Sequence, residues 1–445
     1  DGGMAEVLLA RTKGIEGFER HVVIKRIRSE QAHDQRYVTM FLDEARLAAT
    51  LHHVNVVQVN DIGQEDGEYF FAMEYVHGQD LAHVLHRAPH HKLPLEHALH
   101  IAIGVCAGLH CAHIARDATG RPLDIVHRDV SPSNVLVSYQ GAVKLVDFGV
   151  AQAATLVSET REGVIKGKYG YLSPEQCLGD PLDRRSDVFA VGILLWEMTV
   201  GRRLYAGKGE LAQLQRIVYV DAPPPSRFDP QYPPALERIV VRALARDPRQ
   251  RHHSAEQLQL ELEQFAVDHR LAISAVSLAS EMKALFRDQV EAWSAAERAG
   301  QSLGDHLASA SAAVPLAPGI ELDDLDDDET RGDDMDAETA AAVEQARRAA
   351  ARAFERETRL DLPGAGEAGA APPPPAMVAH PPDRSTAAAP AALPAPVLPH
   401  ELARELRRSQ DVVKIRPSRS VPGGLVVILL LAIAVAWVLL VQRPG

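Results

Sequence analysis

The stretch from His127 to Asp147 constrains the fold more than any other part of the chain. It begins with His127-Arg128-Asp129-Val130-Ser131-Pro132-Ser133-Asn134, and Asp147-Phe148-Gly149 stands at its end, after a segment suited to a short hairpin. Asn134 and Asp147 offer amide and carboxylate oxygens, which are the ligands that Mg²⁺ prefers. A carboxylate such as Asp129 can orient a hydroxyl group and take its proton. Positioning and charge neutralisation of this kind are what phosphoryl transfer requires of a protein.

Further motifs flank this stretch in a fixed order. Gly2-Gly3-Met4-Ala5-Glu6-Val7 is a run in which glycine would let backbone amides approach phosphates. Next come Val22-Val23-Ile24-Lys25, an amphipathic helix near residues 35–51 that contains Glu44, and the apolar strand Phe70-Phe71-Ala72-Met73-Glu74-Tyr75-Val76. Ser173-Pro174-Glu175, Asp187 and Arg251 follow the central stretch. Each motif alone is weak evidence for a phosphoryl-transfer site. Their occurrence in this fixed order makes the combined evidence much stronger.

Taken together, the motifs resemble those of bacterial eukaryotic-type (Hanks-type) serine/threonine protein kinases. The resemblance covers roughly residues 1–268 and implies an α+β, bilobal kinase fold. A small β-rich N-lobe would occupy residues 1–76, incomplete at its start because the first glycine of the loop would precede Asp1, and a helical C-lobe would occupy residues 77–268. ATP and Mg²⁺ are the implied cofactors. Protein hydroxyl groups are the implied acceptors, and self-association would serve autophosphorylation in trans.

The resemblance also implies a role for each site residue. Asp129 would be the catalytic carboxylate, Asn134 and Asp147 would hold the metal, and Lys25 would bind the α- and β-phosphates while paired with Glu44. Met73 would be the gatekeeper residue at the back of the nucleotide pocket. The backbone of Glu74 and Val76 would hydrogen-bond adenine. The residues expected around the nucleotide are Gly2, Gly3, Val7, Val23, Lys25, Met73, Glu74, Val76 and Leu136. Glu175 would pair with Arg251, and Asp187 would hold the catalytic loop.

Two positions depart from the family pattern. Ser131 stands where serine/threonine kinases carry lysine, and Lys168 stands where they carry threonine, in Gly167-Lys168-Tyr169-Gly170-Tyr171. Both side chains meet at the catalytic aspartate in the family. The departures fit neutral drift, loss of activity, or an exchange in which the ammonium comes from Lys168 and the hydroxyl from Ser131.

Three other activities therefore stay open beside a serine/threonine kinase. A pseudokinase scaffold is supported by Ser131, Lys168 and the Ala5 that replaces a loop glycine. A small-molecule kinase would share the Asp/Asn/Asp chemistry, but Glu175, Asp187 and Arg251 argue against it. Tyrosine specificity is slightly favoured by the missing lysine after Asp129.

Several hydroxyl groups are candidates for regulation. Arg128 precedes the catalytic aspartate, where an arginine commonly pairs with a phosphate on the activation segment. The candidates on this segment, which would lie between Asp147 and Glu175, are Thr155, Ser158 and Thr160. Thr330 lies in an acidic run, and a phosphothreonine there could recruit a partner domain; the alternative is a solvated spacer.

The rest of the chain is expected to connect the kinase domain to a membrane anchor. Residues 269–300 are expected to form a helical extension docked on the kinase, because Val276, Leu278, Met282, Leu285 and Phe286 recur at helical spacing. The acidic and Pro/Ala-rich composition of residues 301–420 predicts a disordered linker.

Leu425 to Val441 is an uninterrupted apolar segment, just long enough to form a transmembrane helix, and residues 442–445 would be a short extracytoplasmic tail. Lys414, Arg416 and Arg419 before this segment, against Arg443 alone after it, favour a single-pass protein of the cell membrane with the kinase in the cytoplasm. The net charge of −13 gives no indication of nucleic-acid binding.

Overall fold

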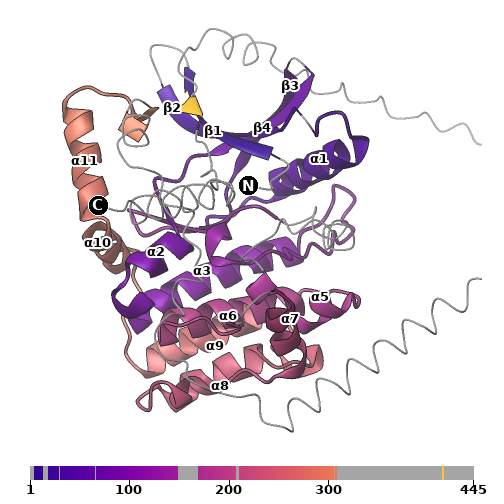
Figure 1. Cartoon of the computed structure of the whole chain (residues 1–445), viewed down its shortest axis with the longest axis vertical. Coiled ribbons are helices and arrows are strands. Elements are labelled where there is room, and N and C mark those ends of the chain that lie inside the picture. The colour runs from indigo at the N-terminus through magenta and orange to yellow at the C-terminus, as the bar shows by residue number, and fades with distance from the viewer. Residues whose placement is uncertain are drawn as a thin grey trace, which may run out of the picture. The chain divides into compact units, whose positions relative to one another are not determined.

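A computed structural model gives the architecture, and it describes residues 5–13, 19–29, 31–65, 67–148, 169–206, 210–304, 306–307 and 413–414. Within this part an antiparallel sheet with one helix lies above a helical lobe (Figure 1). The predicted bilobal α+β architecture is confirmed. Most of the predicted linker and the predicted membrane helix lie outside the described residues.

The N-lobe is built on one sheet in which every neighbouring pair of strands is antiparallel. Its strands, in the order β3-β4-β2-β1-β8, are β1 (Ala5–Lys13), β2 (Glu19–Ile27), β3 (Val59–Glu65), β4 (Glu68–Glu74) and the two-residue β8 (Val413–Lys414). Helix α1 (Gln35–Thr50) buries Phe41 and Ala45 in one cluster with Phe71 and Met73 of β4. The helix therefore packs on the sheet through its apolar stripe, as an amphipathic helix must.

A second, smaller sheet forms the top of the C-lobe and carries the central motif. It joins β5 (Gly78–Asp80), β6 (Val135–Ser138) and β7 (Val143–Leu145), all antiparallel. At Gly78, a Cβ atom would lie 2.1 Å from the carbonyl oxygen of Val137, so only glycine allows this close approach. The β6–β7 hairpin lies between Asn134 and Asp147, and it brings the two predicted metal ligands back toward each other.

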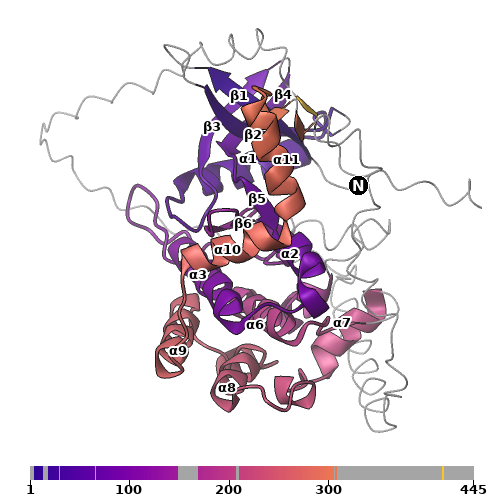
Figure 2. The same ribbon diagram turned by 90° about the vertical axis from the view of Figure 1, so that its left-hand side faces the viewer.

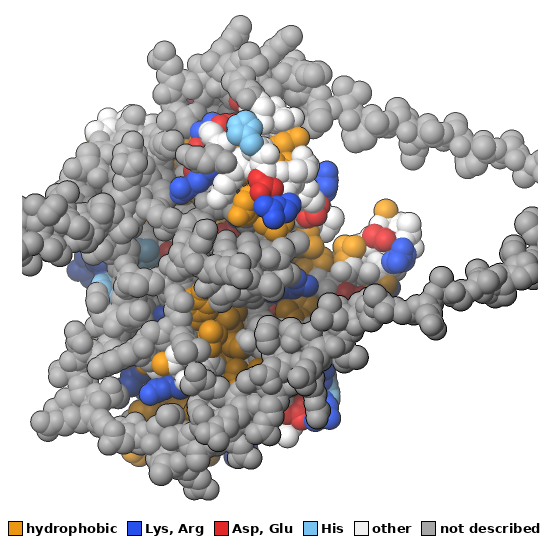
Figure 3. All heavy atoms as spheres, turned by 45° about the vertical axis from the view of Figure 1, so that its right-hand side comes forward, with side chains coloured by type: hydrophobic (Ala, Val, Ile, Leu, Met, Phe, Trp, Pro, Cys, Tyr) orange, Lys and Arg blue, Asp and Glu red, His pale blue; other side chains and the backbone are white. Residues whose placement is uncertain are grey.

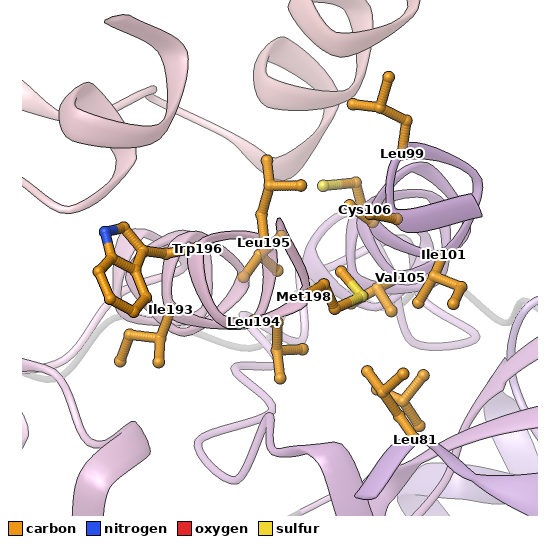
Figure 4. Packing of buried hydrophobic residues seen from close by; sticks show 14 of the residues in the cluster. Leu81, Leu99, Ile101, Val105, Cys106, Ile193, Leu194, Leu195, Trp196 and Met198 are labelled. Atoms are coloured by element: carbon orange, nitrogen blue, oxygen red, sulfur yellow. The ribbon is translucent and has the colours of Figure 1, made fainter. Parts of the chain in front are cut away.

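The C-lobe core is helical. Its helices are α2 (Leu81–Arg87), α3 (Leu95–His113), α5 (Pro174–Leu178), α6 (Arg185–Val200), α7 (Glu210–Tyr219), α8 (Pro234–Ala243) and α9 (Ala255–Asp268). α6 is buried along almost its whole length and ends at Gly201, which adopts a left-handed conformation with φ 80°. Figure 4 shows Leu195 and Met198 of α6 pointing toward Val105 and Cys106 of α3. α3 is the one helix in the described part that is long and apolar enough to cross a bilayer, and most of it is buried in this core.

The extension consists of two helices, α10 (Ala275–Leu285) and α11 (Arg287–Arg298). Leu278, Met282 and Phe286 are at most 1% exposed and belong to the C-lobe core. Val276 was expected in this set, but it is 79% exposed. It lies in the first turn of α10, next to the capping Ser274, on the side that faces solvent.

The helical part continues past residue 300, since residues 303–304 and 306–307 are helical and Leu303 is buried. On the face drawn in Figure 3, acidic and basic side chains of the described residues are interspersed, and they form no large patch of one charge there.

Candidate active site

Lys25 joins two carboxylates that come from distant segments. Its Nζ lies 2.6 Å from Oε1 of Glu44 and 2.8 Å from Oδ1 of Asp147. β2 directs Lys25 toward the lobe interface, and Glu44 shares the buried face of α1 with Phe41 and Ala48. The structure thus brings together three residues that the sequence assigned to one site.

The charges in this network are strongly perturbed. Burial would lower the pKa of Lys25, but the carboxylates of Asp147 and Glu44 outweigh it and raise that pKa above its ordinary value. Burial raises the pKa of Glu44, and Asp147 adds to the shift although Lys25 opposes it. Lys25 therefore stays protonated at neutral pH and remains available to an anionic ligand.

The catalytic loop fixes the carboxylate of Asp129. A 3-10 turn (Pro132–Asn134) brings Asn134 back under the loop. Asn134 Nδ2 donates to the backbone oxygen of Asp129 at 2.7 Å and to its Oδ2 at 2.8 Å. Because the amide nitrogen is used in this way, the side-chain oxygen of Asn134 is the atom left to ligate a metal.

Asp187 holds the backbone of the same loop through hydrogen bonds. It lies in the first turn of α6 and is fully buried. Its carboxylate accepts hydrogen bonds from the backbone N–H groups of His127 (2.8 Å) and Arg128 (2.9 Å), and from Nε2 of His113 (2.8 Å). Burial would raise the pKa of Asp187, but the hydrogen bond from His113 and the charges around it lower it. Asp187 is therefore an anion that orders the loop backbone.

Two residues of the site have strained backbones. Arg128 has φ 68° and Asp147 has φ 57°, in the left-handed region that non-glycine residues rarely occupy. Such residues cluster at functional sites, where surrounding contacts hold them in place. The hydrogen bonds of Asp187 to the backbone at Arg128, and of Lys25 to Asp147, supply such contacts here.

A pair of rings connects the catalytic loop, residues 127–134, to the Asp147-Phe148 motif. The ring centroids of His127 and Phe148 are 4.5 Å apart, and Nε2 of His127 donates to the carbonyl of Val146 at 3.2 Å. Phe148 is buried beside Leu51 and Val56 of the N-lobe. His127 and Phe148 stand inside the two most specific motifs, but neither motif by itself indicates the contact between their rings.

Helix α5 is fixed to the rest of the C-lobe and to the catalytic loop by polar contacts of Glu175 and Gln176. Arg251 donates to both carboxylate oxygens of Glu175, at 2.7 and 2.8 Å, and Ser186 adds a bond of 2.7 Å. Gln176 donates from Nε2 to the carbonyl of Arg128 at 2.8 Å. The expected Glu175–Arg251 pair is present, and Gln176 adds a link to the catalytic loop that the sequence analysis missed.

The residues expected around adenine lie at the junction of the lobes. Met73 is buried at the end of β4, and Val23, Val76 and Leu136 pack against its cluster. Val7 on β1 is 39% exposed. These side chains supply the apolar surface that an aromatic base requires.

Lys144 is a further residue that the sequence analysis missed. Its Nζ lies 2.6 Å from Oε1 of Glu74, the last residue of β4. The contact therefore ties the start of the segment between the lobes to β7. Alternation along Val143-Lys144-Leu145 places the lysine on the face opposite the two buried residues, and this was the available signal.

Ser131 lies within the described part of the chain, next to Ser133. Ser131 is 2% exposed, and its Oγ lies 3.1 Å from Oγ of Ser133. The residues Gly2, Gly3, Thr155, Ser158, Thr160, Lys168 and Thr330 lie outside the described residues.

The residues present fit a magnesium nucleotide. Asp147 and Asn134 provide the hard oxygen ligands that Mg²⁺ takes, and Lys25 provides a positive charge for phosphate oxygens. Asp129, whose Oδ2 and backbone oxygen both accept hydrogen bonds from Nδ2 of Asn134, has a carboxylate that could orient an acceptor hydroxyl.

Comparison with known proteins identifies the family. The protein kinase domain model matches residues 1–262, which is more than half of the chain. The chain belongs to the protein kinase family.

Several curated proteins are similar to this chain. Tyrosine-protein kinase MasK of Myxococcus xanthus is 41% identical over 291 residues, covering 65% of this chain and 45% of that protein. Serine/threonine-protein kinase PrkC of Bacillus subtilis is 34% identical, covering 59% of this chain and 38% of that protein. PknB of Mycobacterium leprae, also a serine/threonine-protein kinase, is 34% identical over 266 residues. The chain therefore spans less than half the length of these relatives.

Proposed function

We propose that the chain catalyses ATP-dependent phosphorylation of serine and threonine hydroxyls on proteins, including its own copies, in bacterial signalling. The observation that carries the proposal is the set of contacts linking Lys25 to Glu44 and Asp147, next to an Asp129 carboxylate held by Asn134. The relatives PrkC and PknB are named serine/threonine-protein kinases, which supports the same activity.

Each residue has a defined part in this proposal. ATP, bound with Mg²⁺, would supply the phosphoryl group and the charge neutralisation of its transfer. Asn134 and Asp147 would hold the metal, and Lys25 would orient phosphate oxygens. Asp129 orients the acceptor hydroxyl and accepts its proton. Asp187 and Gln176 keep the backbone around Arg128 and Asp129 in place.

Mapping of phosphorylated residues tests the activity directly. The purified chain is incubated with ATP and Mg²⁺, and modified residues are identified by mass spectrometry, with an ATP-free sample as control. We expect phosphoserine and phosphothreonine, with sites among Thr155, Ser158 and Thr160 and at Thr330. A chain that binds ATP but gains no phosphate on itself or on a general protein substrate would instead be a scaffold.

Tyrosine phosphorylation is the second candidate. MasK, at 41% identity, is named a tyrosine-protein kinase. Ser131 replaces the lysine that serine/threonine kinases carry after the catalytic aspartate, and it is buried against Ser133. If the mapping experiment finds phosphotyrosine without phosphoserine or phosphothreonine, the chain is a tyrosine kinase.

The exchange of Ser131 and Lys168 can be tested in the same assay. We propose that Lys168 supplies the ammonium that the catalytic loop lacks. Lys168→Thr should lower turnover about 10- to 1000-fold, and adding Ser131→Lys should restore much of it. Strictly additive effects of the two changes would refute the exchange.

We also propose that Leu425–Val441 tethers the kinase to the membrane, with the catalytic domain in the cytoplasm. The support is the apolar length of this segment and the basic residues before it. Deleting residues 425–441 should move the chain from the membrane fraction to the supernatant with its activity retained. A deletion variant that still sediments with membranes would show that another segment is the anchor.

A further inference from the structure

Helix α11 lies against the segment that connects the two lobes. Figures 1 and 2 both show α11 rising from α10, near α2, to the level of β2 in the N-lobe. The connecting segment includes Glu74 and Val76, whose backbone is expected to bind adenine, followed by His77 and β5. The family model match ends at residue 262, so α11 lies beyond the part of the chain that this match covers.

The C-lobe anchors the base of this helix. Phe286, the residue directly before α11, is 1% exposed in the core. Arg87 of α2 donates to both carboxylate oxygens of Asp288, at 3.2 and 3.0 Å, and its guanidinium lies 5.3 Å from the ring of Phe286. His97 of α3 lies 3.0 Å from Oγ of Ser277 in α10. α11 therefore starts from a fixed position on the C-lobe.

In its first turn, α11 also makes polar contacts with β5 and with the residue that follows β6. Oε1 of Gln289 accepts hydrogen bonds from Nε2 of Gln79 at 2.7 Å and from Oη of Tyr139 at 3.1 Å. Gln79 lies on β5, and Tyr139 donates from its backbone N–H to the carbonyl of His77 at 3.0 Å. The side chain of Gln289 thus bonds both to β5 and to the residue that directly follows β6.

A row of rings continues from α11 to the N-lobe. Trp293 is 6.1 Å from His77, His77 is 6.2 Å from Tyr75, and Tyr75 is 6.2 Å from His21 on β2. These centroid distances lie in the range of favourable aromatic pairs. Burial lowers the pKa of His77 and of His21, so both rings are neutral at neutral pH. Burial raises the pKa of Tyr75 to about 12, so its hydroxyl stays protonated.

We infer that α11 braces the segment between the lobes, and that Trp293 and Gln289 are positioning residues for nucleotide binding. This inference depends on the proposed kinase function. Contacts on one side of residues 75–79 restrict the arrangements that the adenine-binding backbone can adopt. When a protein binds its ligand in only some of its arrangements, the apparent Kd rises as the competent fraction falls. Loss of the brace should therefore weaken nucleotide binding more than it slows the chemical step.

The test compares variants of the whole chain, residues 1–445, by two independent readouts. Trp293→Ala and Gln289→Ala should each raise the KM for ATP, and the calorimetric Kd for ADP, about three- to tenfold. The turnover number should stay within about twofold of wild type, because the catalytic residues are untouched. Glu291→Ala, at an exposed position on the same helix, is the matched control and should change neither value. Trp293→Phe keeps a ring beside His77 and should recover most of the affinity.

A simple structural role would give a different pattern. Partial unfolding would lower the turnover number by reducing the active fraction, and it would leave KM unchanged. That pattern, or an unchanged KM and Kd in Trp293→Ala, would overturn the inference. Absence of phosphorylation in the wild type would count against the proposed function alone, since the Kd for ADP still reports on the brace.

Discussion

At the scale of single residues, Lys25 depends on two carboxylates at once. Glu44→Gln leaves the Asp147 contact but removes the charge that fixes Lys25 from α1. We expect kcat/KM to fall about 10- to 100-fold, because a hydrogen bond between charged groups contributes about 1.5–3 kcal/mol. Asp43→Asn, at the exposed neighbouring position, is the control in steady-state assays. Wild-type kcat/KM in Glu44→Gln would mean that Asp147 alone sets the position of Lys25.

The buried pair of Glu175 and Arg251 should affect stability and its pH dependence. Glu175→Gln leaves a buried guanidinium without its counter-charge, so the free energy of unfolding should fall by about 3–5 kcal/mol. Burial would raise the pKa of Glu175, but its bonds to Arg251 outweigh this and lower it below the ordinary value of 4.5. The stabilisation is therefore fully present above pH 4.5 and is lost as the pH falls through the lower, folded-state value.

Denaturant unfolding at several pH values measures this effect. The difference between wild type and Glu175→Gln should shrink as the pH falls below 4.5. Arg46→Ala removes an exposed pair with Asp43 and should change the unfolding free energy by no more than about 0.5 kcal/mol. A difference that stays constant down to acidic pH would exclude the charge of Glu175 as its source.

Sequence motifs identify residues well when chemistry alone determines the residue type. Lys25, Glu44 and Asp147 were expected together, and they lie within hydrogen-bonding distance. Lys144 could not be assigned in the same way, because its contact with Glu74 depends on how β7 lies relative to the end of β4. Such a contact is set by tertiary packing, and local sequence does not encode it.

At the scale of elements, the first turn of α6 controls the catalytic loop. Asp187→Asn replaces an acceptor of three hydrogen bonds with a group that can accept fewer, and the backbone at His127 and Arg128 loses its support. We expect the turnover number to fall about 100-fold, since a shift of about 1 Å in a catalytic group has this effect. The calorimetric Kd for ADP should change little. Equal losses in turnover and affinity would mean that Asp187 supports the whole lobe and not the loop.

Helix boundaries were easier to predict than helix partners. α6 ends at Gly201, because glycine readily adopts the left-handed conformation that closes a helix, and the residue type alone can indicate such an end. The periodicity of the extension indicated helices but included Val276, which faces solvent, because a first-turn residue can fit the period without facing the core. Nothing local in α11 indicated that Trp293 would meet His77, since the two residues are far apart in the sequence.

At the scale of the whole molecule, the extension forms one core with the C-lobe. Met282→Ala should lower the free energy of unfolding by about 2–5 kcal/mol, because the side chain is fully buried and its loss leaves a cavity. Val276→Ala, on the same helix but 79% exposed, should change it by at most about 0.5 kcal/mol. Denaturant unfolding measures both. Equal, small effects would show that α10 is only loosely attached.

The central claim is that Asp129 is the carboxylate that orients and deprotonates the acceptor hydroxyl, in a site that binds nucleotide through other residues. The most direct measurement combines phosphate transfer to a protein substrate with calorimetric binding of ADP, for wild type and Asp129→Asn. We predict that Asp129→Asn lowers turnover about 10²- to 10⁴-fold while the Kd for ADP stays close to the wild-type value. Phosphorylation by Asp129→Asn at the wild-type rate would contradict the account.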